Sequence, residues 1–253
     1  MCGTCACGEP AAPLRQVTLQ QRVLAHNDQH AAANRQRFRE TGVRVLNLLS
    51  SPGSGKTALL ERLARERGPS ETMAVLVGDL ATDLDAQRLR AAGLPTVALT
   101  TGQACHLDAA MVERGVEALA EQGVALAGLQ WLLIENVGNL VCPAAYDLGE
   151  ELRVVLLGVG EGEDKPLKYP AMFRSADVVV ISKIDLAAAV DFNREAALAA
   201  LAQVAPQAAV VEVSARSGAG IAGLLELCSE DPSSNPKERR LRATTGRDVK
   251  RSF

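Results

Sequence analysis

The most restrictive feature of the sequence is a glycine-rich stretch that joins two apolar segments of different pattern. The stretch "SSPGSGKTALL" (Ser50–Leu60) follows the mostly apolar segment "VRVLNLL" and leads into residues 56–66, which predict a helix. A strand, a glycine-rich turn, a Lys-Thr pair and a helix, in that order, are typical of a phosphate-binding loop. Gly53 and Gly55 allow backbone N–H groups to curve around phosphates, and the helix N-terminus adds a favourable dipole. The stretch therefore predicts a nucleotide site on an α/β fold.

The polar residues of this loop have predicted roles. Lys56 supplies positive charge to the β- and γ-phosphates, and the Thr57 hydroxyl is placed to ligate Mg²⁺. Ser50 stands where the motif G-x-x-x-x-G-K-[ST] has its first glycine. We expect six residues of the loop to bind nucleotide: Gly53, Ser54, Gly55, Lys56, Thr57 and Ala58.

Apolar runs alternate with helical stretches along the rest of the chain, which predicts a mostly parallel sheet with helices on both faces, a P-loop NTPase fold. The expected strands are residues 43–49, 73–79, 96–99, 131–136, 153–159, 177–183 and 209–214. The expected helices are residues 18–40, 56–66, 83–92, 107–122, 191–204 and 217–228. We expect three regions: a flexible cysteine arm over 1–14, a GTPase domain with an N-terminal helix over 15–228, and a disordered basic tail over 229–253.

Charge and hydropathy argue against several other classes of protein. The net charge is −3, and basic residues concentrate in Lys237–Arg251, which holds seven basic and two acidic residues. The remaining, acidic body lacks the electrostatic footprint of a nucleic-acid binder. The longest apolar stretch, "VALAGLQWLLI", is too short to span a membrane, and the first residues do not have the pattern of a secretion signal. We expect no nucleic-acid or membrane partner and a cytoplasmic location, where cysteines stay reduced.

Two acidic residues end predicted strands on the side where ligands bind in open α/β sheets. Asp79 closes "VLVGD" and Glu135 closes "WLLIE". Each carboxylate can hold Mg²⁺, directly or through water, or orient the attacking water, so we predict catalytic roles for both together with Lys56. Gly138, in "ENVG", is expected to bring a backbone N–H to the γ-phosphate.

Two further segments indicate which base is bound. "SKID" (Ser182–Asp185) follows a strand like the N-K-x-D element of GTPases, and the Asp185 carboxylate can accept two hydrogen bonds from guanine, whereas adenine lacks the exocyclic amine that donates one of them. The stem of Lys183 can lie along the base. "SARSG", with Ser214 and Ala215, is similar to the loop that closes over guanine. The pair favours GTP over ATP, although Ser182 replaces the usual asparagine and loses its amide contact.

Thiol and imidazole ligands occur in two segments that follow strands. Cys105 and His106 are adjacent before a predicted helix, and Cys142 comes seven residues after Glu135. Two thiolates and an imidazole suit Zn²⁺ or Ni²⁺. The alternative is two partly buried cysteines and a surface histidine without a metal. Cys228, in an amphipathic helix, is expected to have no special role.

The chain begins "MCGTCACG", so Cys2, Cys5 and Cys7 precede any predicted element. Three thiolates with a nitrogen from the terminal amine or the first peptide would form a planar set, which suits Ni²⁺ better than Zn²⁺. The alternative is a redox-active or adventitious cluster.

Several of these blocks together resemble the HypB family, the hydrogenase nickel-incorporation GTPases of the SIMIBI class. The resemblance covers about residues 17–228 and the first eight residues, and it rests on "MCGTCACG", "NLLSSPGSGKTALL", "TGQACHLDAAMV", "LIENVGNLVCPAAYDLGE" and "EGEDKPLKYPAMF". It implies slow, Mg²⁺-dependent GTP hydrolysis and a nickel metallochaperone for [NiFe]-hydrogenase maturation. It also implies a nucleotide-dependent homodimer, a HypA-type metallochaperone and the hydrogenase large subunit as partners, and a nucleotide or subunit contact for Lys165 and Lys168.

Three other interpretations are compatible with the sequence. A urease accessory GTPase shares the fold, but its metal motif is Cys-Pro-His. A non-catalytic metal-buffering protein or a thiol redox protein would use the same cysteines without GTP turnover. Within the GTPase reading, the seven residues from Glu135 to Cys142 predict a short route from hydrolysis to metal affinity.

Overall fold

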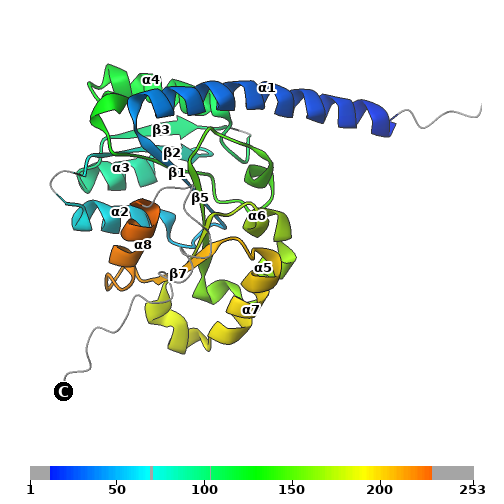
Figure 1. The fold of residues 1–253 in the computed structure, drawn as a ribbon, viewed down its shortest axis with the longest axis vertical. Helices are drawn as coiled ribbons and strands as arrows, with labels where there is room; N and C mark the ends of the chain where they lie inside the picture. Colours follow the sequence, from blue (N-terminus) through cyan, green and yellow to red (C-terminus); the bar gives the residue numbers. More distant parts are fainter. Residues whose placement is uncertain (1–11, 69–70, 103, 230–253) are drawn as a thin grey trace, which may run out of the picture.

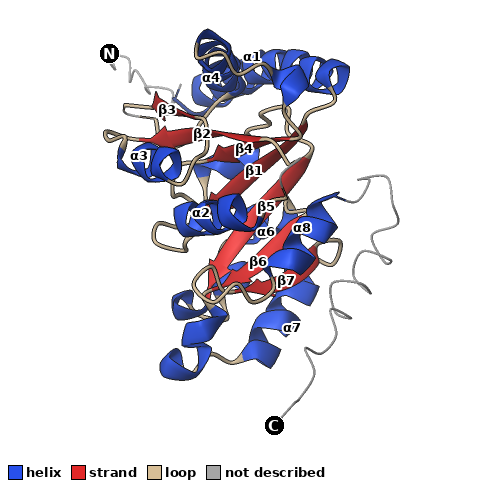
Figure 2. Cartoon of the chain, turned by 90° about the vertical axis from the view of Figure 1, so that its left-hand side faces the viewer, coloured by secondary structure: helices blue, strands red, loops and turns tan. Residues whose placement is uncertain are grey.

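A seven-stranded parallel sheet forms the centre of the molecule (Figures 1 and 2). The computed structural model describes residues 12–68, 71–102 and 104–229, and their side chains from residue 21 onward. The strands are β1 (Arg44–Ser50), β2 (Met73–Asp79), β3 (Thr96–Thr100), β4 (Trp131–Glu135), β5 (Leu152–Gly158), β6 (Val178–Ser182) and β7 (Ala209–Val213). They run in the order β3-β2-β4-β1-β5-β6-β7, and all neighbours are parallel. The predicted parallel α/β sheet is confirmed.

Helices cover both faces of this sheet (Figure 2). They are α1 (Ala12–Thr41), α2 (Lys56–Glu66), α3 (Leu84–Ala91), α4 (Ala109–Glu121), α5 (Lys165–Lys168), α6 (Pro170–Arg174), α7 (Arg194–Val204) and α8 (Ile221–Ser229). Short 3₁₀ turns occupy Leu126–Gly128, Cys142–Ala145, Val159–Glu161 and Ile184–Val190. No helix in this described part of the chain is long and apolar enough to cross a membrane.

The starts of α1 and α8 differ most from the sequence prediction, while α4 and α7 begin two and three residues later than expected. Helix α1 begins at Ala12, inside the segment expected to be a flexible arm, and its first turns extend beyond the body of the fold (Figure 1). Helix α8 begins at Ile221 rather than residue 217, because Gly218 and Gly220 adopt φ values of +88° and +76°. A side chain at Gly220 would meet the Glu212 carbonyl, so the chain turns here before the helix starts.

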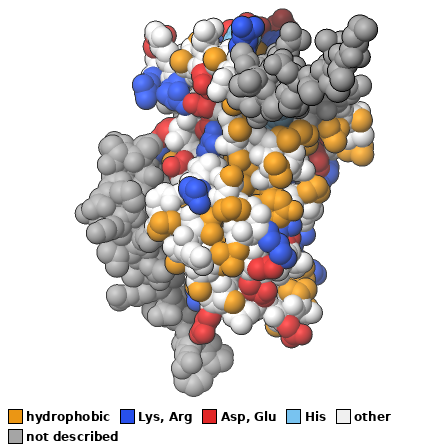
Figure 3. Space-filling model, turned by 90° about the vertical axis from the view of Figure 1, so that its right-hand side faces the viewer, with side chains coloured by type: hydrophobic (Ala, Val, Ile, Leu, Met, Phe, Trp, Pro, Cys, Tyr) orange, Lys and Arg blue, Asp and Glu red, His pale blue; other side chains and the backbone are white. Residues whose placement is uncertain are grey.

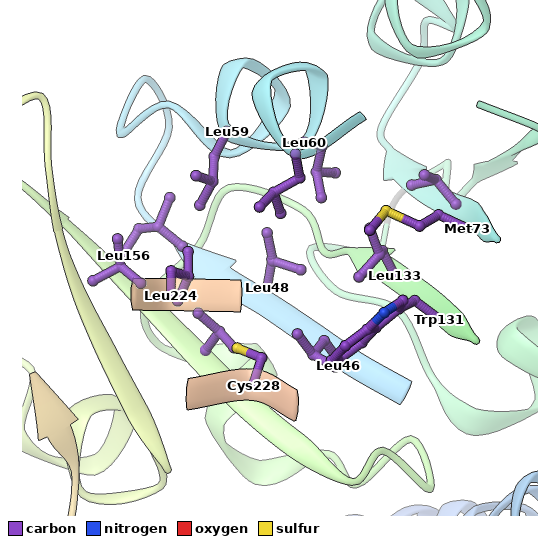
Figure 4. Close-up of a cluster of buried hydrophobic side chains, with 14 of the residues drawn as sticks. Leu46, Leu48, Leu59, Leu60, Met73, Trp131, Leu133, Leu156, Leu224 and Cys228 are labelled. Carbon is purple, nitrogen blue, oxygen red and sulfur yellow. The ribbon is translucent and has the colours of Figure 1, made fainter. Parts of the chain in front are cut away.

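The strand side chains alternate between two apolar layers, as the pleat requires. One layer lies under α2, α3 and α8, and Figure 4 shows Leu48 pointing toward Leu60 and the Trp131 ring beside Leu46. Cys228 is buried in the same layer. On the opposite face, α1 and α4 cover one half of the sheet and α6 and α7 cover the other.

The strand order brings the carboxyl ends of β1, β2 and β4 together. Strand β1 lies between β4 and β5. From β1 the chain continues toward one edge of the sheet, and from β5 it continues toward the other edge. A ligand crevice usually lies at such a reversal of the strand order. In the ladder, Glu135 is level with Leu48 on one side and Val77 on the other. The predicted arm ligands and the basic tail lie outside the described residues.

Candidate functional site

A cleft of about 530 Å³ opens at the carboxyl ends of β1, β2 and β4. Its lining contains most of the predicted nucleotide and magnesium residues, which come from separate parts of the chain. They are Gly53, Gly55, Lys56, Thr57, Ala58, Asp79, Glu135, Gly138 and Lys183. Ser54 is buried within the phosphate loop, and its hydroxyl has no hydrogen-bond partner among the described groups.

Ser50 gives the lysine of the loop a partner. The Lys56 Nζ donates to Ser50 Oγ at 2.8 Å, and Ser50 is fully buried at the end of β1. Burial lowers the pKa of Lys56, while the charge of Glu135 opposes that shift. A glycine at position 50 would leave this buried ammonium without the hydroxyl, which is a physical reason for the serine in the motif.

Glu135 is the most strongly perturbed acid in the cleft. Its Oε1 accepts a hydrogen bond from Thr57 Oγ1 at 2.8 Å, and its Oε2 is buried with no partner among the described residues. Burial raises the pKa of Glu135 to about 7, although the nearby Lys56 charge and the Thr57 bond lower it. A buried carboxylate oxygen beside a threonine hydroxyl is a donor set that a hard divalent cation would satisfy.

Asp79 lies at the more exposed side of the cleft. Thr82 Oγ1 donates to Asp79 Oδ2 at 2.6 Å. Two residues missed in the sequence, Asp85 and Arg88 of α3, also line the cleft, and Arg88 pairs with Asp85 at 3.2 Å. The repeated acidic residues in "GDLATDLDA" were the available signal for Asp85.

The "SKID" segment is attached directly to the phosphate loop. Ser182 Oγ donates to the Ser54 carbonyl at 2.6 Å, and Lys183 Nζ donates to the Gly53 carbonyl at 2.6 Å. Lys183 adopts a left-handed φ of 61°, which turns the chain at the end of β6. Ser182 thus retains a contact with the loop even though it lacks an amide.

Asp185 and Ser214 lie together beyond Lys183. Ser214 Oγ donates to Asp185 Oδ1 at 2.6 Å, so the two predicted guanine-contacting segments touch. Arg62 of α2, which the sequence did not single out, donates to the Ala215 carbonyl at 3.5 Å and the Arg216 carbonyl at 3.2 Å. The loop after β7 is therefore held from two sides.

Glu161 links the phosphate loop to the "EDKPLKYP" segment. It accepts a hydrogen bond from the Ser51 hydroxyl and another from the Gly158 N–H at 2.9 Å. Lys165 Nζ lies 3.5 Å from Glu161 Oε2, whereas Lys168 pairs with Asp164 on the surface. Lys165 is thus separated from the loop by one carboxylate.

Cys105, His106 and Cys142 form a compact cluster. Their ligand atoms all lie within 4.8 Å of one another, and the three side chains are half-buried. Cys105 and His106 occupy the loop before α4, and Cys142 begins the 3₁₀ turn after β4. The two segments expected to approach each other do so, with the donor set of a zinc or nickel site.

The surroundings of the cluster affect its protonation. A hydrogen bond with Cys142 is the main cause that raises the pKa of the Cys105 thiol. Burial lowers the pKa of His106, which favours the neutral imidazole that can ligate a metal. The ring of Tyr146 lies against His106 with centroids 3.8 Å apart.

Comparison with known proteins agrees with this arrangement. Residues 44–212 match the family described as CobW/HypB/UreG, nucleotide-binding domain. The hydrogenase maturation factor HypB of Azotobacter chroococcum is 52% identical over 207 residues, which cover 82% of this chain and 66% of the relative. The crystal structure of HypB from Helicobacter pylori in complex with nickel has a TM-score of 0.77 at 38% identity, covering 88% of this chain and 99% of that chain. The chain belongs to the HypB family of hydrogenase maturation factors.

The HypB relatives distinguish between two interpretations of the sequence, a hydrogenase maturation GTPase and a urease accessory GTPase. The hydrogenase/urease maturation factor HypB of Helicobacter pylori is 42% identical over 207 residues, 82% of this chain and 84% of the relative. These matches favour the hydrogenase maturation family over the separate urease accessory GTPase. The chain spans about two thirds of the length of the Azotobacter relatives.

Two asparagines connect the nucleotide cleft of this HypB-family chain to its thiol cluster. Asn136 directly follows Glu135, and its Oδ1 accepts a hydrogen bond from the Leu107 N–H at 3.1 Å. Asn139 Nδ2 donates to the Cys105 carbonyl at 3.2 Å. The segment after β4 is therefore bonded to the loop that carries Cys105, in addition to carrying Cys142 itself.

Helix α1 joins the two segments that carry the cluster. Asn27 accepts from the Ala109 N–H at 2.9 Å and donates to the Asp147 carbonyl at 2.8 Å. Asn34 donates to the Ala109 carbonyl at 2.8 Å and to the Leu148 carbonyl at 3.1 Å. Both asparagines are buried. These bonds could not be predicted from the sequence, since α1 has the pattern of a polar helix and the partners are backbone groups far along the chain.

Proposed function

We propose that this chain is a GTP-hydrolysing nickel metallochaperone that helps to insert Ni²⁺ into the large subunit of [NiFe]-hydrogenase. One observation carries the proposal: the backbone of the loop that holds Cys105 and His106 is hydrogen-bonded to Asn136 and Asn139, in the segment that starts at Glu135 of the nucleotide cleft and also carries Cys142. A change at Glu135 therefore has a short covalent and hydrogen-bonded route to the metal ligands.

The nucleotide cleft supports hydrolysis of a phosphate anhydride. Lys56 and the backbone N–H groups of the loop carry the positive charge that developing charge on a γ-phosphate requires. Thr57, Asp79 and Glu135 offer oxygen ligands for Mg²⁺, which when bound would neutralise the β- and γ-phosphate charge. The buried, unpartnered Glu135 Oε2 supports this fit.

Guanine is the base that the remaining residues favour. The carboxylate of Asp185 is oriented by Ser214, and an aspartate in this position can accept two hydrogen bonds from guanine. Ala215 and the stem of Lys183 would flank the base. Ser182 contributes by holding the phosphate loop rather than by contacting the base.

Nickel handling is assigned to two sets of ligands. The cluster would bind Ni²⁺ or Zn²⁺ with an affinity that depends on whether GTP or GDP is bound. Cys2, Cys5 and Cys7 would form the second, arm site. A reducing cytoplasm would keep both sets of thiols available.

Exposed apolar side chains support association with protein partners. Hydrophobic side chains gather over the middle of the face on the side of α5 and α6 (Figure 3). Val141, directly before Cys142, is 64% exposed. We assign this region to a nucleotide-dependent homodimer in which the clusters lie near the interface, with a HypA-type metallochaperone and the hydrogenase large subunit as further partners.

The proposal is tested by transfer of metal to its acceptor. Purified protein is loaded with Ni²⁺, mixed with nickel-free large subunit and GTP, and the nickel content of the re-isolated large subunit is measured. Transfer that requires GTP and is lost in Lys56→Ala supports the proposal. Transfer that is equal without nucleotide contradicts it and favours a metal-buffering protein.

A further inference from the structure

A second group of metal-capable side chains lies on α1, apart from the thiol cluster. His26 and His30 are four residues apart, so they share one face of the helix. Their ring centroids are 4.8 Å apart with an interplanar angle of 50°. His26 is exposed and His30 is half-buried, so both can be reached from solvent. Together with His106 they are all the histidines of the chain.

The two rings line a cavity of about 290 Å³ between α1 and the start of α4. Asp108 and Tyr146 lie on the other side of this cavity. The same Tyr146 ring contacts His106, and Asp108 is two residues from it in the chain. The cavity is therefore adjacent to the thiol cluster, with the Tyr146 ring shared between them.

His30 has a carboxylate partner on one of its ring nitrogens. Its Nδ1 lies 2.9 Å from Glu113 Oε2. When the neutral ring donates its Nδ1–H to that carboxylate, the lone pair of Nε2 is available, and carboxylate–histidine pairs of this kind orient ligands in metal sites. Asp108 uses Oδ1 to accept from the Met111 N–H at the start of α4, and a carboxylate has a second oxygen that can take a cation.

We infer that His26 and His30, with the Asp108 carboxylate, form a second site for a divalent transition-metal ion at the surface of α1. Two imidazoles and one carboxylate suit Ni²⁺ or Zn²⁺, and water would fill the remaining positions. Within the described residues, the thiol cluster is the one group of three ligands whose donor atoms all lie within 4.8 Å of one another. The α1 site has fewer preformed ligands, so it binds more weakly and exchanges its ion more readily.

The position of the site suggests its use. Helix α1 follows the cysteine segment in the chain, and the site borders the cluster. A weak site there holds Ni²⁺ beside the cluster before the thiolates take it. This role rests on the proposed function, whereas metal binding by the histidines does not.

The test uses the 253-residue chain with five substitutions that remove both thiol sites: Cys2→Ser, Cys5→Ser, Cys7→Ser, Cys105→Ser and Cys142→Ser. Ni²⁺ is titrated calorimetrically, and the imidazole resonances are followed for broadening by the paramagnetic ion. We expect one binding step that broadens the His26 and His30 signals. The step should weaken about tenfold or more in Glu113→Gln, which removes the carboxylate that orients His30. It should disappear in His26→Gln/His30→Gln and stay unchanged in Gln29→Ala, an exposed residue on the same helix.

Ni²⁺ binding that persists in His26→Gln/His30→Gln, or that broadens only His106, would overturn the site. Its use is tested with wild-type thiols, by following the thiolate-to-nickel absorption of the cluster. Slower loading in His26→Gln/His30→Gln with an unchanged final amplitude supports the holding role, and an unchanged rate refutes it. If the nickel affinity of the cluster is the same with GTP and with GDP, the proposed function is contradicted. That result would not affect the histidine titration.

Discussion

The nucleotide cleft and the thiol cluster are built in different ways, although they are neighbours. The phosphate loop is a continuous segment between β1 and α2, and its shape comes from backbone geometry. The cluster joins two loops from distant parts of the chain, and asparagine side chains of α1 and of the segment after β4 hold those loops together. The cleft should therefore tolerate changes in α1, whereas the cluster should not.

Lys56→Ala should have the largest effect of these substitutions, and that effect should be confined to the cleft. Loss of the only loop ammonium should reduce GTP turnover by about 10²–10³-fold, because charge on the γ-phosphate is no longer stabilised. The nickel absorption of the cluster in nucleotide-free protein should stay as in wild type. Steady-state phosphate release and a Ni²⁺ titration measure the two quantities. A variant with near-normal turnover would contradict the assigned role.

Glu135→Gln tests the electrostatics of the cleft through pH. The native pKa of Glu135 is raised from 4.5 to about 7, so the folded state holds a proton that the unfolded state has lost between these values. Stability should therefore fall as pH rises through this window, by roughly 3 kcal/mol in total, because the buried carboxylate becomes charged.

Urea unfolding of nucleotide-free protein at about pH 5 and pH 8 measures this difference. Wild type should lose stability relative to Glu135→Gln across the window, and added Mg²⁺ with nucleotide should reduce the loss. If the free energy of unfolding changes equally with pH in the two proteins, burial does not raise the pKa of Glu135.

Asn34→Ala tests whether α1 holds the cluster. The change leaves the Ala109 and Leu148 carbonyls without their donor, which should lower the free energy of unfolding by about 2 kcal/mol. Nickel affinity of the cluster should fall about tenfold, as for other groups that support metal ligands. GTP affinity should not change.

Gln36→Ala, which removes only an exposed bond to Glu40, is the matched control on the same helix. Equal nickel affinity in Asn34→Ala and the control would mean that the cluster is organised without α1.

Ser182→Ala has the smallest expected effect. It removes a buried hydrogen bond to the Ser54 carbonyl and should weaken GTP binding by about fivefold, equivalent to about 1 kcal/mol. Ser175→Ala removes a similar hydroxyl–carbonyl bond at the end of α6, remote from the cleft, and should leave GTP affinity unchanged. Titration with a fluorescent nucleotide compares the GTP affinities of the two variants. A wild-type affinity in Ser182→Ala would show that this residue does not contribute to GTP binding.

The same contrast explains what could be predicted from the sequence. The strand bounds were predicted to within one residue, because buried parallel strands are continuous apolar runs. The loop residues were recognised because their functional spacing is local. Glu135 and Cys142 were placed near the cleft because parallel strands end at one edge.

The supporting side chains were not predictable in this way. The bond from Lys56 to Ser50 and those of Asn27 and Asn34 depend on side-chain directions or on partners far along the chain. A polar helix gives no periodic signal for which of its asparagines will be buried. The start of α8 was predicted too early because Gly218 and Gly220 were not recognised as a left-handed turn.

The most direct measurement is the affinity of the cluster for Ni²⁺ in two nucleotide states. A chain with serine at positions 2, 5 and 7 is saturated with GDP or with a non-hydrolysable GTP analogue, and Ni²⁺ is titrated while the thiolate absorption is recorded. We expect the Ni²⁺ affinity to differ between the two states, and the absorption to be lost in Cys142→Ser. Equal affinity with GDP and with the analogue would contradict the coupling between the cleft and the cluster.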